Sequence, residues 1–262
     1  NLLRILFVIL LFGRKNKYLT QEKYIQLLKF LSARKHNKEY KLINPQTTVD
    51  ITYKPDKETN IRCSLIGQEY IDKFMKKVGM LKNHVIFTIL IKSSQTEKKQ
   101  IEIMKKIKNV ENTIDIDNLD LRVRLSQESS LSKEELTTMS KLDYNSMNLI
   151  TFRYKKRTSL YVLGDETTQE FIRVDLTETK MSDQYDKINF AIPNYELEVE
   201  YGTKKTSKKE TLKNIFVEIE LLYKIIQQSN YIMTNEISDK VMSEYKNILS
   251  LTDANKKIIN LD

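Results

Sequence analysis

The sequence predicts an α+β protein built on one antiparallel barrel of about eight strands with flanking helices. Acidic and apolar residues alternate strictly from 194 to 201, and basic residues recur at every second position in segments before it. Side chains on a strand point alternately to opposite faces, so these strands have one charged and one apolar face. Amphipathic segments at both ends and between strands can cover an apolar outer wall, which leaves the charged faces to line an enclosed lumen.

Composition indicates a compact globular protein, which we treat as a single domain spanning residues 1–262. The chain has 40% hydrophobic and 30% charged residues with only 5 glycines and 3 prolines. Its net charge of +9 favours a polyanionic partner such as nucleic acid or a nucleotide. One cysteine excludes an internal disulfide, and two histidines leave too few ligands for a zinc site. The chemistry must therefore use carboxylates, lysine, arginine and hydroxyls. The apolar opening is too short to span a bilayer, so no membrane association is expected.

The first part of the chain is predicted to mix strands and helices. In order, the patterns predict a buried strand at 5–12, a helix capped by Thr20, strands at 47–53 and 60–66, a helix at 68–78, a strand at 84–92 and a lysine-rich surface helix or excursion at 95–108.

Strands dominate the second part. The patterns predict strands at 119–126, 149–163, 171–179 and 194–201, a capped helix or loop insertion at 130–140, and closing helices at 207–228 and 235–249.

The strand at 194–201 places Glu196, Glu198 and Glu200 on one face. Three carboxylates about 7 Å apart repel one another unless a cation lies beside them. Mg²⁺ or Mn²⁺ would serve, because a hard divalent ion takes carboxylate oxygens and keeps waters for a phosphate substrate. The alternative is a solvated acidic face, which an isolated E-x-E-x-E pattern would favour.

Basic residues with the same spacing favour an anionic ligand. Arg153, Lys155 and Arg157 share a face of one strand, and Arg173 and Asp175 share a face of the next. One arginine guanidinium can bind two phosphate oxygens at once, and lysine offers a point charge. Both side chains stabilise the charge that develops on a departing phosphoryl group. The alternative is a salt-bridged surface strand, which contributes little to stability.

Together these segments resemble the RNA 5′-triphosphatase domain of the triphosphate tunnel metalloenzyme family, as in the N-terminal part of giant-virus, mimivirus-like mRNA capping enzymes. The resemblance rests on the order R-x-K-x-R-x-S, then Arg173-Val174-Asp175-Leu176-Thr177, then E-x-E-x-E. It extends over most of the chain and includes the segments 49–53, 68–71 and 244–247.

The resemblance implies roles for individual residues. Glu196, Glu198 and Glu200 would hold Mg²⁺ or Mn²⁺, and Asp175 would orient a basic residue or assist the attacking water. The triphosphate would be bound by basic residues of the tunnel: Arg153, Lys155, Arg157 and Arg173, with Arg62, Lys92, Arg122 and Arg124 as further candidates.

One strand departs from the family pattern. The family's first strand supplies two further metal-binding glutamates, and we expect their places to fall on Phe7 and Ile9. Three explanations are open: an inactive domain, a change in this sequence, or a glutamate pair upstream of Asn1.

The resemblance implies an mRNA 5′-triphosphatase that removes the γ-phosphate of nascent viral mRNA in the first step of capping. Alternatives are a tunnel hydrolase of tripolyphosphate or nucleoside triphosphates, and a catalytically degenerate tunnel that binds RNA or protein. The guanylyltransferase motif K-x-D-G is absent, so that activity, like a methyltransferase, would belong to another domain or subunit. The expected location is the viral factory in the host cytoplasm, or the virion.

Overall fold

Eight antiparallel strands form a closed barrel in the order β1-β5-β4-β3-β2-β6-β7-β8. The computed structural model describes residues 4–11, 18–37, 40–54, 59–97, 99–141, 150–165, 167, 170–203 and 209–259. The strands are β1 (Arg4–Leu11), β2 (Lys41–Tyr53), β3 (Thr59–Ile66), β4 (Ile101–Ile116), β5 (Leu121–Ser130), β6 (Ile150–Leu163), β7 (Glu170–Ser182) and β8 (Asn194–Thr203). The predicted eight-stranded barrel is therefore confirmed.

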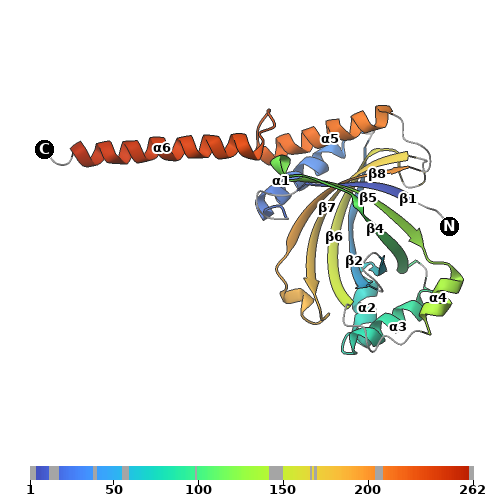
Figure 1. The fold of residues 1–262 in the computed structure, drawn as a ribbon. Helices are drawn as coiled ribbons and strands as arrows, with labels where there is room; N and C mark the ends of the chain where they lie inside the picture. The colour runs from blue at the N-terminus through green and yellow to red at the C-terminus, as the bar shows by residue number, and fades with distance from the viewer. Residues whose placement is uncertain are drawn as a thin grey trace.

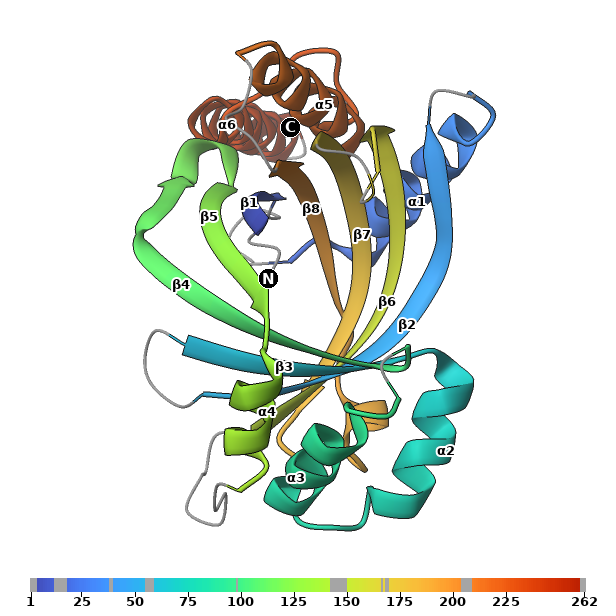
Figure 2. The same ribbon diagram turned by 90° about the vertical axis from the view of Figure 1, so that its right-hand side faces the viewer.

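Helices cover two regions of the outer wall (Figures 1 and 2). One group packs below the barrel in Figure 2 and consists of α2 (Gln68–Val78), α3 (Asn83–Ser93) and α4 (Lys133–Met139). The other group consists of α1 (Gln21–Arg34) and α5 (Lys209–Gln227), and α6 (Asn235–Ile259) extends away from the barrel in Figure 1. Two short 3-10 turns occupy Asp117–Leu119 and Ile188–Phe190. None of the helices in the described ranges has the length and apolar content that crossing a membrane requires.

Among the described residues, two large apolar cores lie outside the lumen, because the strands turn their apolar faces toward the helices. The first packs α2 and α3 against β2, β3, β4 and β6, and Phe87, Leu90 and Ile51 are fully buried in it. The second packs α1 and α5 against β6, β7 and β8, and Leu27 and Leu197 are fully buried in it. The charged faces of the strands are left to line the interior.

Helix α1 begins where the sequence predicts. The Thr20 hydroxyl accepts a hydrogen bond from the Lys23 N–H at 3.4 Å, which satisfies one of the free amides at the helix start. Farther along, Arg34 pairs with Glu218 of α5 and lies over the Tyr40 ring, 4.1 Å from its centroid. These contacts fasten α1 to α5 on the outer wall.

The insertion after β5 is also capped as expected. Ser132 Oγ accepts from the Glu135 N–H at 3.1 Å, and the Glu135 carboxylate accepts from the Ser132 N–H at 2.7 Å. This reciprocal pair is a capping box, and it starts α4.

Two segments differ from the sequence prediction. Residues 84–92, predicted as a strand, form most of α3, and residues 101–108 of the predicted lysine-rich helix or excursion belong to β4. In α3 the buried residues are Ile86, Phe87, Leu90 and Ile91, which is the spacing of one helix face. A continuous apolar run rich in β-branched residues does not distinguish a buried strand from a buried helix.

Gly202 lies where β8 passes under an aromatic ring. A Cβ added at this position would lie 2.3 Å from Phe171 Cε1. Since both residues are buried, Gly202→Ala is expected to displace the ring and destabilise the fold by about 1–3 kcal/mol. Urea unfolding of the variant measures this cost. An unchanged midpoint would show that the Phe171 ring moves without loss of packing.

Candidate functional site

The barrel encloses a cavity of about 400 Å³ whose lining is predominantly charged. Seven basic side chains line it among the described residues: Arg62, Lys106, Arg124, Arg153, Lys155, Arg157 and Arg173. Four carboxylates line it as well: Asp50, Glu102, Glu198 and Glu200. The lining therefore carries an excess of three positive charges. Counting Asp175 and Glu196, which contact lining arginines, reduces the excess to one.

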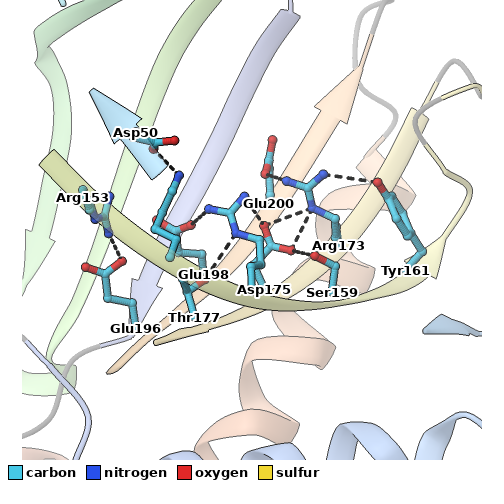
Figure 3. Close-up of polar contacts among 12 residues, drawn as sticks. Asp50, Arg153, Ser159, Tyr161, Arg173, Asp175, Thr177, Glu196, Glu198 and Glu200 are labelled. Atoms are coloured by element: carbon cyan, nitrogen blue, oxygen red, sulfur yellow. Dashed lines mark hydrogen bonds and ion pairs between the residues drawn. The ribbon is translucent and has the colours of Figure 1, made fainter. Parts of the chain in front are cut away.

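Basic residues of β6 reach acidic residues of β8 over the strand β7 that lies between them, and Figure 3 shows the contact of Arg153 with Glu196. Arg153 donates to Glu196, and the Arg157 Nη2 lies 3.4 Å from Glu198 Oε2. Arg173, on β7, donates to Glu200. Each of the three glutamates thus contacts one arginine.

Asp175 lies beneath the cavity wall and joins two of these arginines. It is fully buried, its Oδ1 lies 2.9 Å from Arg173 Nε, and its Oδ2 lies 3.4 Å from Arg157 Nη1. Ser159 Oγ donates to the same carboxylate at 2.6 Å. Burial by itself would raise the pKa of Asp175, but the two guanidinium groups outweigh it and hold that pKa below its usual value. Asp175 is therefore placed to orient the arginines rather than to contact a ligand.

Burial has the opposite net effect on two of the glutamates. It raises the pKa of Glu200 to about 7, and the charge of Arg173 opposes this shift only in part. It also raises the pKa of Glu196 against the opposing charge of Arg153.

A second buried ion pair, which we did not predict, lies between β2 and β6. Lys155 pairs with Asp50, and Ser64 Oγ donates to the same carboxylate at 2.8 Å. Burial would raise the pKa of Asp50, but Lys155 and Arg62 lower it to about 2. Burial lowers the pKa of Lys155 to about 8 despite the charge of Asp50. The signal was present in the sequence, because Asp50 lies between Val49 and Ile51 in the same alternation that marks the glutamates.

Aromatic residues lie beside Arg173. Tyr161 lines the cavity, its hydroxyl accepts from Arg173 Nη1 at 3.2 Å, and its ring packs edge-on against Phe171 with centroids 5.9 Å apart. The guanidinium of Arg173 is thus held by a phenol, two carboxylates and two ring faces. Tyr161 was also absent from the predicted site.

The four further candidates for phosphate binding have different positions. Arg62 and Arg124 line the cavity, as expected. Lys92 does not, because its segment is helix α3 and its side chain is exposed to solvent, so that assignment is wrong. Arg122 is absent from the cavity lining and instead forms a paired contact with Asp115, at 2.5 Å and 2.8 Å, across β4 and β5.

The register of β1 corrects the places expected for the missing glutamates. Val8 lies opposite Glu200 and Leu10 opposite Glu198, whereas Phe7 and Ile9 lie opposite Tyr201 and Val199. Directly opposed residues share a face of the sheet. The positions next to the β8 glutamates are therefore those of Val8 and Leu10, one residue along from our expectation, and neither carries a carboxylate.

The residues present do not fit a magnesium or manganese ion as they are arranged. Glu196, Glu198 and Glu200 occupy successive lumenal positions, and each contacts an arginine. Within the residues that the structure describes, no group of three His, Cys, Asp or Glu side chains is placed to hold a metal ion. An octahedral ion needs several oxygens at about 2.1 Å.

Comparisons with known proteins agree with this architecture. No protein-family model matches the chain. It is 30% identical over 211 residues to a probable mRNA-capping enzyme of Acanthamoeba polyphaga mimivirus, an alignment that covers 79% of this chain and 16% of that enzyme. The chain thus spans about a sixth of the length of this relative.

Solved structures are similar over most of the barrel. The RNA triphosphatase domain of a trifunctional mimivirus mRNA capping enzyme matches with a TM-score of 0.64 and 23% identity, covering 86% of this chain and 89% of that one. A triclinic structure of the mimivirus capping enzyme triphosphatase matches with a TM-score of 0.64 and 22% identity, covering 87% and 90%. The chain therefore has the fold of these triphosphatase domains.

Proposed function

We propose that this chain is a polynucleotide 5′-triphosphatase, which hydrolyses the γ-phosphate from the 5′-triphosphate end of viral mRNA as the first step of cap formation. The observation that carries the proposal is the enclosed row of Arg153, Lys155, Arg157 and Arg173 facing a cavity with excess positive charge. Similarity to a mimivirus capping enzyme, and to structures described as its triphosphatase, supports the same substrate.

The side chains suit binding and charge stabilisation. Each arginine can bind two phosphate oxygens through parallel N–H···O hydrogen bonds, while Lys155 supplies a point charge. As water attacks the γ-phosphorus and the bond to the bridging oxygen breaks, charge builds up on the phosphoryl and leaving oxygens. Arg157 and Arg173, fixed by Asp175, would stabilise this charge without reorganising. The products are orthophosphate and a 5′-diphosphate end.

The test is release of orthophosphate from three substrates: RNA with a 5′-triphosphate, inorganic tripolyphosphate, and ATP. Release from RNA is the expected result. Release from tripolyphosphate or ATP alone would indicate instead a tunnel hydrolase of small polyphosphates. Running each reaction with Mg²⁺, with Mn²⁺ and with a chelator tests the expected cofactor, which stays a prediction.

A catalytically degenerate binding tunnel is the second candidate. It is favoured by the aliphatic residues opposite Glu198 and Glu200, and by the arginine that each glutamate contacts. No release from any substrate under any metal condition would contradict hydrolysis and support this candidate.

The proposed product defines the partner. A 5′-diphosphate RNA end is the acceptor for a guanylyltransferase, so we propose that a guanylyltransferase, with a methyltransferase after it, acts next as another domain or subunit. The solved relative belongs to a capping enzyme described as trifunctional. The viral factory or the virion is the proposed location.

A further inference from the structure

The lumenal glutamates act as internal counter-ions for the arginines. Arg153, Arg157 and Arg173 each contact a different glutamate of β8. Because these glutamates occupy alternate positions of β8, the three pairs follow that strand. Figure 3 labels the two outer pairs, Arg153 with Glu196 and Arg173 with Glu200.

The side chains of Arg153 and Glu196 keep 30% and 16% of their surface exposed, those of Arg157 and Glu198 keep 29% and 21%, and those of Arg173 and Glu200 keep 11% and 12%. The Arg157–Glu198 contact is the longest of the three, at 3.4 Å. It is therefore the weakest of these contacts and the easiest for an entering anion to separate.

The strands beside β8 do not complete a set of metal ligands. On one side, β1 places Val8 and Leu10 at the two positions opposite Glu200 and Glu198. On the other side, β7 places Arg173 and Asp175 there, and both Asp175 oxygens lie within 3.4 Å of a guanidinium nitrogen. The carboxylates of β7 and β8 in this region, those of Asp175 and the three glutamates, therefore already form ion pairs with arginines.

From this arrangement we infer that the tunnel binds the 5′-triphosphate end without a divalent metal, its phosphate oxygens displacing the glutamates from Arg153 and Arg157. The inference rests on the substrate class of the proposed function but concerns binding only. The glutamates then compete with the substrate instead of holding a metal that attracts it.

Charge and geometry favour this exchange. A triphosphate brings several negative charges into a lining that already has more basic than acidic side chains. Its oxygens can engage a guanidinium in pairs, whereas the Arg157 contact with Glu198 is a single long one. Arg153 also has a buried Nε for which no hydrogen-bond partner exists among the described residues, so a donor is available for a phosphate oxygen.

The two ways of binding predict opposite effects of Glu198→Gln. If Glu198 competes with the substrate, neutralising it removes one carboxylate that competes for Arg157, whose contact with Asp175 remains, and the affinity for triphosphate-ended RNA in a chelator should rise about five-fold. If Glu198 holds a metal that bridges to the phosphates, the same variant should bind more weakly than the unmodified chain in the presence of Mn²⁺. Glu220→Gln is the matched control, because Glu220 is an exposed glutamate of α5 that pairs with Lys224 away from the cavity.

The measurement is fluorescence anisotropy with RNA labelled at its 3′ end and carrying a β,γ-imido 5′-triphosphate, which prevents cleavage. We expect Kd in EDTA and in Mn²⁺ to agree within about three-fold, and 5′-hydroxyl RNA to bind at least ten-fold more weakly. Binding that requires Mn²⁺, or binding by Glu198→Gln that is weaker than that of the unmodified chain in Mn²⁺ or in EDTA, would overturn the inference.

Failure here is distinct from failure of the proposed function. Metal-free binding without phosphate release would contradict hydrolysis and leave the inference intact. Release of phosphate together with binding that requires Mn²⁺ would support hydrolysis and contradict the inference of metal-free binding.

Discussion

Replacing Arg157 with alanine is expected to lower the rate of phosphate release from triphosphate-ended RNA by about 10²–10³-fold, the usual effect of removing one charge-stabilising donor. Arg157 is the basic residue of β6 that contacts both Asp175 and Glu198, and it lines the cavity. Its loss removes a transition-state contact and leaves the Glu198 carboxylate at the cavity surface without this arginine. Single-turnover release of orthophosphate measures the effect.

The matched control is Lys76→Ala. Lys76 is an exposed lysine of α2 outside the cavity lining, so this variant removes one positive charge from the molecule without altering the lumen. Its rate should equal that of the unmodified chain. If Arg157→Ala retains more than about a tenth of the rate, Arg157 does not stabilise the transition state.

Replacing Asp175 with asparagine is expected to destabilise the fold by about 3–5 kcal/mol, because it removes the charge that Arg157 and Arg173 share. The carboxylate is fully buried, so water does not replace it. Denaturant unfolding at pH 7 measures the loss. Asp186→Asn, at an exposed position after β7, should be within about 0.5 kcal/mol of the unmodified chain.

The same substitution has a defined pH dependence. The pKa of Asp175 is lowered in the folded state, so its contribution to stability is complete above the unfolded value of about 3.9 and is lost as the pH falls below it. The stability difference between the unmodified chain and Asp175→Asn should therefore narrow as the pH falls below about 4. A constant difference over that range would show that the loss is due to packing and not to charge.

Strand alternation predicted most of the barrel from the sequence. The charged residues of β6, β7 and β8 recur at every second position, and the structure brings Arg153, Arg157 and Arg173 to the glutamates of β8. Parity within a strand is a local property, so a sequence reveals it directly. The predicted catalytic and metal-binding roles of these residues remain to be tested.

Properties that depend on contacts between distant segments of the chain were harder to predict. Which arginine meets which glutamate follows from the register between strands, and a shift of one residue transfers a side chain to the other face. That is why the places expected at Phe7 and Ile9 fall at Val8 and Leu10 in the pairing of β1 with β8. The apolar run of α3 was similarly ambiguous, because its helical character depends on burial against β3 and β4.

The two outer cores allow the tunnel to change its chemistry while the architecture persists. Apolar packing is concentrated between the barrel wall and the helices, so substitutions among cavity-facing residues leave most of that packing in place. Carboxylates inside the bore can then be gained or lost without rebuilding the helical support. The mimivirus domain has a similar fold at only 23% identity, as expected for an architecture that outer packing maintains.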